Sequence, residues 1–182
     1  MSKGNRELRD VRDLAPVDHA RQLPRLLRLL AAQSTQLTNY TALGAAVGLG
    51  HQTARKYTDL LSQLYLVRML PPWHSNEISR ITKSSKVHFL DSGLLTALRQ
   101  LTAARIKADR HLFGPVLETF VLAELLKLVA AHGDPLELFH FRDRYGSEVD
   151  LVIEDSEANI VGIEVKASAT VTEKDFSGLR KL

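Results

Sequence analysis

Three residues near the end of the printed sequence have types and a spacing that could support hydrolysis of a phosphodiester: Asp150, Glu164 and Lys166. They lie in residues 139–169, whose pattern predicts a strand, a second strand, a short turn and a third strand. If the last two strands are neighbours, two carboxylates and an ammonium group converge on an otherwise apolar sheet. Carboxylate oxygens suit Mg²⁺ and Mn²⁺, and a lysine can orient or deprotonate an attacking water. The pattern predicts a metal-dependent phosphodiesterase site.

The faces of these strands follow from the two-residue period of an extended chain. In the second strand, one face is predicted to carry Glu148, Asp150 and Val152, and the other Val149, Leu151 and Ile153. In the third strand, one face is predicted to carry Ile163 and Val165, and the other Glu164 and Lys166. The apolar flanks favour central strands, where a charge costs free energy unless it is paired or liganded. The alternative is an ordinary ion pair on a solvated strand face.

A third carboxylate comes from a predicted helix ahead of the sheet. Pro115 begins a long amphipathic pattern, and Glu118 lies early in it. An inward-facing Glu118 would complete the metal site. The alternative is that this acid only complements the positive end of the helix dipole. Residues 102–112, just before the helix, are polar and are predicted to be a connector.

The composition excludes several classes of protein. The 182 residues include no cysteine, so disulfides and thiolate zinc sites are excluded. The seven histidines form no HExxH motif, which makes a classical zinc enzyme unexpected. No apolar run has the roughly 18 residues that a membrane span needs, and no signal peptide is recognisable. We therefore expect a cytoplasmic protein that does not bind membranes.

Charge is distributed unevenly along the chain. Residues 1–110 hold 17 Lys and Arg against 8 Asp and Glu, whereas residues 111–182 hold 7 against 13. A basic half could neutralise nucleic-acid phosphates, while an acidic half would repel them unless a cation intervened. The alternative is that the two surfaces attract each other or a partner protein.

Residues 37–70 predict a helix-turn-helix. Asn39 or Thr41 would cap the first helix, Gly48-Leu49-Gly50 would form the turn, and a second helix would run from about His51 to Gln63. Two strand-like runs follow, YLVRML and KVHFL, separated by a segment that contains Pro71-Pro72-Trp73. Two strands directly after a helix-turn-helix are the outline of a winged helix.

A winged helix predicts contacts with nucleic acid, most simply with DNA. The second helix would present Gln52, Thr53, Arg55 and Lys56 to the major groove. Contact with phosphates is favoured over base recognition, and its predicted residues are Arg55, Lys56, Arg68, Arg80, Lys83 and Lys86. The alternative is a winged helix that serves only as a protein-docking or spacer module.

Five segments follow one another along the chain: RDVRDLAPVDHARQLPRLLRLLAAQ, the helix-turn-helix, KSSKVHFLDSGLLTAL, GPVLETFVLAELLK, and FRDRYGSEVDLVIE followed by GIEVKASA. Across essentially the whole chain, this order resembles prokaryotic AAA-type ATPases that carry a C-terminal domain of unknown function. In that family an ATPase module precedes a winged helix and a domain resembling PD-(D/E)xK nucleases. The resemblance implies an α/β fold. A helical linker and a winged helix-turn-helix would occupy residues 1–105, and a restriction-endonuclease-like mixed sheet flanked by helices would occupy residues 106–182.

The sequence departs from this family in two respects. It has no G-x-x-x-x-G-K-[ST] loop, so no nucleotide site is expected here and the ATPase module is expected only in the full-length family member. It also ends at DFSGLRKL, where family members continue through a further helix and strand. The nuclease-like domain is therefore expected to be truncated.

The resemblance places the nuclease-like residues at Glu118, Asp150, Glu164 and Lys166. It implies that Asp150 and Glu164 bind one or two Mg²⁺ or Mn²⁺ ions with help from Glu118, and that Lys166 positions the water. Val149 replaces the proline of the nuclease motif, which leaves the metal-binding carboxylate in place.

Two further residues of the same family segment, Arg142 and Glu148, have an open role. They either form an ion pair that shapes the site or contact phosphate.

Three functions remain as hypotheses. The first is a DNA-binding, metal-dependent phosphodiesterase. The second is a non-catalytic module that docks nucleic acid or protein for an ATPase, since this fold often loses its activity. The third is a transcription regulator built on the winged helix alone.

Overall fold

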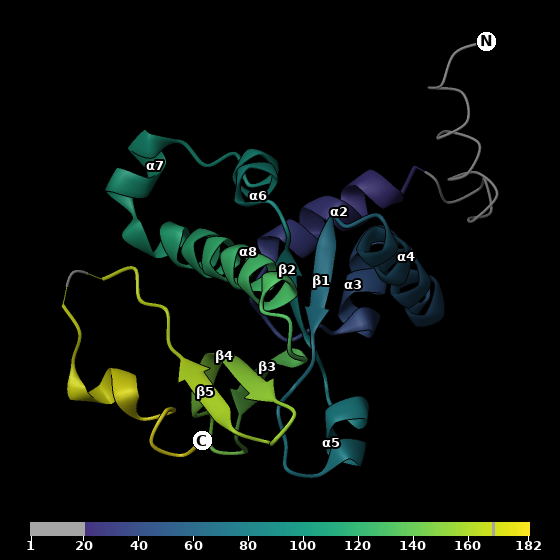
Figure 1. Cartoon of the computed structure of the whole chain (residues 1–182). Helices are drawn as coiled ribbons and strands as arrows, with labels where there is room; N and C mark the ends of the chain where they lie inside the picture. The colour runs from purple at the N-terminus through teal and green to yellow at the C-terminus, as the bar shows by residue number, and fades with distance from the viewer. Residues whose placement is uncertain (1–20, 169) are drawn as a thin grey trace.

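The computed structural model describes residues 21–168 and 170–182. Asp18, which the sequence suggests as the cap of the helix that contains Leu23 and Leu30, lies outside these residues. The N-terminal part contains the helices α2 (Leu23–Ala32), α3 (Tyr40–Val47) and α4 (His51–Gln63), then strand β1 (Val67–Leu70), helix α5 (Glu77–Thr82) and strand β2 (Lys86–Phe89). Strands β1 and β2 are antiparallel partners, with Val67 opposite Phe89. Figure 1 shows them between α2–α4 and the rest of the chain.

Local sequence chemistry explains the turn between α3 and α4. The Asn39 side chain caps α3 by accepting a hydrogen bond from the Ala42 amide at 3.0 Å. Gly48 ends the helix with a left-handed φ of 73°, which a residue without Cβ adopts at little cost. A Cβ at Gly44 would lie 2.5 Å from the Leu49 carbonyl oxygen, so only glycine allows this close approach. The predicted order of helix, turn, helix and two paired strands is confirmed.

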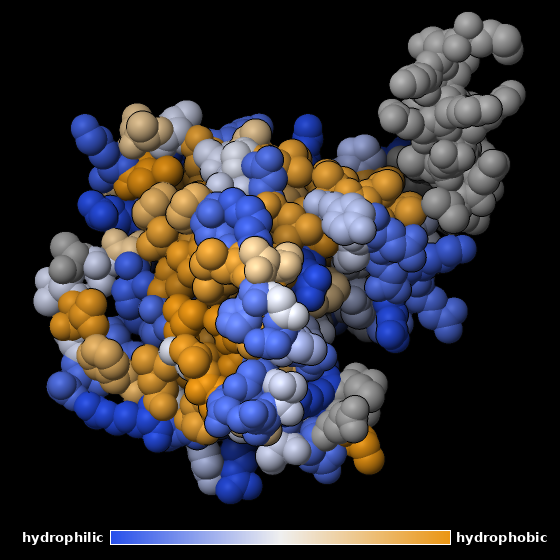
Figure 2. All heavy atoms as spheres, in the orientation of Figure 1, coloured by the Kyte–Doolittle hydropathy of each residue, from blue (hydrophilic) through white to orange (hydrophobic). Residues whose placement is uncertain are grey.

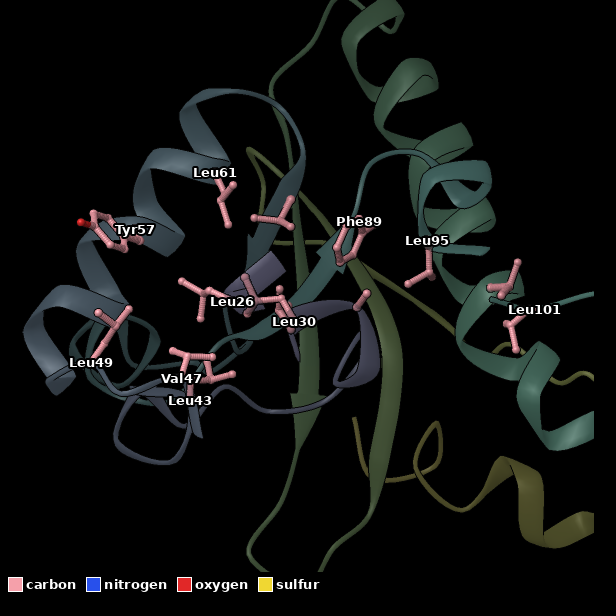
Figure 3. Packing of buried hydrophobic residues seen from close by; sticks show 14 residues of the cluster. Leu26, Leu30, Leu43, Val47, Leu49, Tyr57, Leu61, Phe89, Leu95 and Leu101 are labelled. Carbon is pink, nitrogen blue, oxygen red and sulfur yellow. The ribbon is translucent and has the colours of Figure 1, made fainter. Parts of the chain in front are cut away.

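Apolar side chains of these elements form one core. Leu26 and Leu30 of α2 pack with Leu43, Tyr57 and Phe89, all of which are buried. Figure 3 shows Leu26, Leu30 and Leu61 in the space between the helices and the strand pair. Burial of such side chains stabilises the fold by about 1.5–3 kcal/mol each.

The C-terminal part begins with α6 (Ser92–Leu98) and contains α7 (Ala103–Ala108), a 3-10 turn η2 (Arg110–Phe113), α8 (Gly114–Ala131), β3 (Leu136–Arg142), β4 (Glu148–Asp155), β5 (Ile160–Ile163) and a 3-10 turn η3 (Glu173–Phe176). Residues 102–112, predicted as a polar connector, contain the short helix α7 and the turn η2. The Thr102 hydroxyl accepts from the Arg105 amide at 3.2 Å and begins α7, a local cap inside a polar segment.

The predicted three strands form an antiparallel sheet in the order β3-β4-β5. The ladder between β3 and β4 shifts register, because Phe139 lies opposite Val152 and Phe141 opposite Val149. Two residues of β4, Asp150 and Leu151, therefore face one residue of β3, which is a β-bulge. The predicted strict alternation was wrong at this point, since Val152 packs with Val149 instead of sharing the face of Asp150.

Both faces of the sheet are covered. Leu122 of α8 packs with Leu138 and Leu151 on one face. On the other face, Leu179 and Leu182 from the C-terminal segment pack near Val149 and Val152. In Figure 2, apolar side chains gather over α8 and the sheet. No helix of the described residues is long and apolar enough to cross a membrane.

The two parts of the chain are joined beside the sheet. The His140 amide donates to the Pro71 carbonyl at 2.9 Å, and the Trp73 amide donates to the His140 carbonyl at 2.6 Å. The segment after β1 therefore pairs with β3 and protects one edge of the sheet. Arg80 strengthens this joint, because its guanidinium donates to Glu154 Oε1 at 2.8 Å and lies 4.8 Å from the Phe139 ring centroid.

Candidate functional site

Asp150 lies at the bulge of β4 and is 8% exposed. Its Oδ2 accepts a hydrogen bond from the Val165 amide at 2.8 Å. The bulge changes the direction of the Asp150 side chain, so that its carboxylate binds the backbone just after β5. The same bond fixes the position of the two residues beside Val165, which are Glu164 and Lys166.

Glu164 and Lys166 follow β5 instead of lying within it. The strand ends at Ile163, opposite Leu151, so the predicted third strand is shorter than expected. Lys166 Nζ donates to Glu164 Oε1 at 2.6 Å and lies 3.9 Å from Asp175 Oδ1. Glu164 Oε2 is buried and has no hydrogen-bond partner among the described residues.

Glu118 lies in the first turns of α8, near enough to Asp150 and Glu164 for their charges to act on it. Burial raises the pKa of Glu118 to about 8, and the nearby Asp150 carboxylate adds to the rise. The Lys86 charge and a hydrogen bond with the Thr35 side chain oppose it. Glu118 is therefore half-buried near Asp150, and burial favours its protonated form.

Lys86 occupies a position that the sequence did not predict. We expected a surface contact with phosphate, but the side chain is 3% exposed. Its Nζ lies 3.3 Å from Glu148 Oε2 and 3.9 Å from Asp150 Oδ1. Glu148 also pairs with Arg142, which bears out the ion-pair alternative for those two residues. The reason is that β2 runs into the interior between the two parts of the chain, where an unpaired ammonium group would be costly.

The protonation state of Lys166 narrows its chemical role. Burial alone would lower the pKa of Lys166, but its hydrogen bond to Glu164 and the charges of Glu164, Asp150 and Asp175 outweigh burial and raise it. An ammonium group with a raised pKa cannot accept a proton from water near neutral pH. Lys166 can therefore orient and stabilise anionic oxygen, whereas deprotonation of water is disfavoured.

The donor set suits a hard cation, although the side chains are not assembled around one. Glu118, Asp150 and Glu164 offer carboxylate oxygens, and one of these oxygens, Glu164 Oε2, is buried and makes no hydrogen bond with the residues that the structure describes. In the part of the chain that the structure describes, no group of three or more His, Asp or Glu residues has the arrangement to hold a metal ion. The two lysines hold these carboxylates instead.

A cavity of about 540 Å³ opens beside Lys166. It is lined by Arg110, His111 and Lys166, together with Gly114 and residues 165–168. Arg110 donates weakly to the Ala167 carbonyl at 3.4 Å, which keeps the guanidinium at the rim. The cavity is lined by cationic groups and adjoins the carboxylates, so it suits an anionic ligand.

The predicted nucleic-acid contacts divide into two groups. The exposed residues are Gln52, Arg55, Lys56, Arg68 and Lys83, and Thr53 is half-buried. Arg80 and Lys86 instead form ion pairs with the acids Glu154 and Glu148 of the sheet.

Sequence reasoning did not find Thr35, Arg110 or His111. Each lies in a polar segment without periodicity, and only the tertiary fold brings it to the site.

Comparison with known families identifies both parts of the chain as domains of unknown function. A domain of unknown function, DUF8612, matches residues 7–105, which is more than half of the sequence. The chain belongs to the DUF8612 family. A second domain of unknown function, DUF4143, matches residues 113–182 of this DUF8612 protein. Lys86 therefore comes from the first matched region, and the acids that it contacts come from the second.

Two uncharacterized mycobacterial proteins are similar to this DUF8612 protein. They are Rv2008c of Mycobacterium tuberculosis and Mb2031c of Mycobacterium bovis, each 32% identical over 163 residues. The match covers 89% of this chain but 36% of each relative, so the chain spans about a third of their length. No solved structure matches the chain.

Proposed function

We propose that this chain binds DNA and carries a Mg²⁺- or Mn²⁺-dependent phosphodiesterase site. One observation carries the proposal. Glu118 of α8, Asp150 of β4 and Glu164 after β5 interact electrostatically with one another, with Lys166 bonded to Glu164. A cluster of acids with a perturbed pKa beside a cationic cavity is typical of a functional site.

Each residue has a defined part in this proposal. Asp150 and Glu164 would hold the cation, and Glu118 would give up its proton to join them. A bound Mg²⁺ or Mn²⁺ would polarise the phosphodiester and lower the pKa of a bound water. The Lys166 ammonium would orient the water and stabilise negative charge on the phosphate oxygens. Arg110 and His111 would hold a neighbouring phosphate in the cavity.

The N-terminal part would hold the duplex nearby. We propose that α3, α4 and the strand pair β1–β2 act as a winged helix, with α4 as the helix that approaches the groove. Arg55, Lys56, Arg68 and Lys83 have exposed side chains and would contact phosphates. We further propose that β3–β5 and α8 form a PD-(D/E)xK-like core. DUF4143 domains typically occur with AAA-type ATPases, which supports an ATPase module as partner in the full-length protein.

A cleavage assay tests this function. Wild-type protein in about 5 mM Mn²⁺ or Mg²⁺, a concentration expected to saturate a weak carboxylate site, should cleave linear or branched DNA. EDTA should stop the reaction, and Asp150→Asn should slow it at least about 100-fold, because it removes a metal-binding charge that also fixes Glu164 and Lys166. Product length on a denaturing gel is the measurement.

A matched control separates catalysis from general charge effects. Glu157→Gln makes the same kind of change on an exposed acid in the turn between β4 and β5, and it should leave the rate unchanged. Absence of cleavage by folded wild-type protein that still binds DNA, on both substrates and with both metals, would contradict the proposal.

A non-catalytic docking module is the second candidate, and one observation favours it. Lys86 and Lys166 already pair with Asp150 and Glu164, so the carboxylates are neutralised without a cation. On this hypothesis the ion pairs only join the two parts of the chain. The same assay distinguishes the candidates, because a docking module would bind DNA or protein without cleaving either.

A further inference from the structure

We propose that the Lys86 ammonium group is a built-in competitor of the divalent cation, so that metal binding at Asp150 requires Lys86 to leave it. This inference rests on the proposed metal site and adds a residue that controls its occupancy. It also gives the first part of the chain a direct role in the chemistry of the second.

The placement of Lys86 carries the inference. Its side chain is 3% exposed, and its Nζ lies within 4 Å of two carboxylates, those of Glu148 and Asp150. Water therefore contributes little to the solvation of this charge, and the carboxylates supply the compensation. The Asp150 oxygen that faces Lys86 is Oδ1, while Oδ2 accepts from the Val165 amide. Lys86 thus faces the oxygen of Asp150 that this backbone bond leaves available for a cation.

The other groups around Lys86 do not replace the carboxylates. His88 and His140 are both buried, and burial followed by the Lys86 charge lowers their pKa values to about 3 and about 4. Both imidazoles are neutral at pH 7 and offer no negative charge. Glu118 is near enough for the Lys86 charge to affect its pKa. On the far side of Glu148, Arg142 shares that carboxylate.

Electrostatics then sets the direction of the effect. A divalent cation at Asp150 would lie beside the Lys86 ammonium, and like charges at such distances repel strongly where water is excluded. The cation must displace Lys86 from Asp150 or bind weakly. Removing the ammonium group while keeping the chain's volume should therefore tighten metal binding.

Titration of Mn²⁺ by calorimetry tests the competition. Lys86→Met keeps an unbranched apolar stem and removes the charge, and we expect it to lower the Mn²⁺ Kd at least about tenfold relative to wild type. The gain should vanish when Asp150→Asn is added to Lys86→Met. Lys86→Arg keeps the charge and should bind no more tightly than wild type. Lys127→Met removes a lysine from an exposed pair with Glu124 and serves as the matched control without effect.

A second measurement uses the wild-type protein, in case the buried substitution impairs folding. The rate of Lys86 acetylation by an amine-reactive ester, followed by mass spectrometry of the peptide, should rise when Mn²⁺ saturates the protein. The rate at exposed Lys107 should not change. A folded Lys86→Met protein with unchanged or weaker Mn²⁺ affinity, or an unchanged acetylation rate of Lys86 with saturating Mn²⁺, would overturn the inference.

The two proposals can fail separately. Tighter Mn²⁺ binding by Lys86→Met without DNA cleavage by any variant supports the competition and contradicts the phosphodiesterase. Metal-dependent cleavage by wild type, with equal Mn²⁺ affinity in the folded Lys86→Met protein, supports the phosphodiesterase and overturns the competition.

Discussion

Lys166→Met is expected to lower the rate of metal-dependent DNA cleavage by about 100- to 1000-fold, and to tighten Mn²⁺ binding because it removes an ammonium group bonded to Glu164. The reason is that Lys166 and the carboxylates have different roles at the site. Lys166 donates to Glu164 and has a raised pKa, so it supplies a fixed positive charge rather than a base. Its loss removes stabilisation of the phosphate oxygens, whereas Asp150 and Glu164 still offer their oxygens to the cation. Single-turnover rates and calorimetry of the same preparations measure the two effects.

The control for this variant is Lys174→Met, which removes an exposed lysine from η3 and should change neither quantity. The dependence of the cleavage rate on pH gives a further check. If Lys166 acted as a base it would have to be neutral, and the rate would fall at lower pH as Lys166 took up a proton. A Lys166 that acts as an ammonium group predicts no such fall. A cleavage rate for Lys166→Met within tenfold of wild type would show that this ammonium group does not act in the reaction.

Glu118→Gln is expected to remove a strong pH dependence from the unfolding free energy measured in EDTA. Burial, reinforced by Asp150, raises the pKa of Glu118 to about 8 in the folded protein. The folded state therefore binds a proton more tightly than the unfolded state. The stability from this proton is fully present below the unfolded pKa of about 4.3 and is lost as the pH rises through about 8. Between pH 5 and pH 9, wild type should lose on the order of 4 kcal/mol relative to Glu118→Gln, since this range covers about three pKa units at about 1.4 kcal/mol each.

Urea unfolding of both proteins at several pH values measures this difference. Glu124→Gln changes an exposed acid on the same helix and should follow wild type. Saturating Mn²⁺ should shrink the difference, because a cation would keep Glu118 ionised at lower pH. Parallel pH profiles of wild type and Glu118→Gln would contradict a buried, protonated Glu118.

Local patterns were sufficient to predict most elements of the fold. The cap at Asn39, the turn at Gly48 and the proline at the start of α8 are determined by neighbouring residues, so the sequence shows them directly. The bulge at Asp150 was not predictable in this way, because it depends on the register between β4 and β3. Strict alternation is the right expectation until a partner strand is known.

The same distinction applies to the candidate site. Asp150, Glu164 and Lys166 are close in sequence, so their strand pattern was enough to nominate them as a group. Lys86 is 62 residues from Glu148, and no period or spacing connects the two. In the sequence, Lys86 lies among polar residues and therefore suggested contact with phosphate. Only the tertiary structure shows that it is buried beside Glu148 and Asp150.

Diffraction from crystals soaked in Mn²⁺, with data collected at the manganese absorption edge, tests the central claim most directly. We predict one anomalous peak at roughly 2.0–2.4 Å from carboxylate oxygens of Asp150 and Glu164. Glu118 should turn toward the peak, and Lys86 Nζ should lie farther from Asp150 than the present 3.9 Å. A saturated crystal with no peak at these carboxylates, or with manganese only at other acids, would contradict a metal site here.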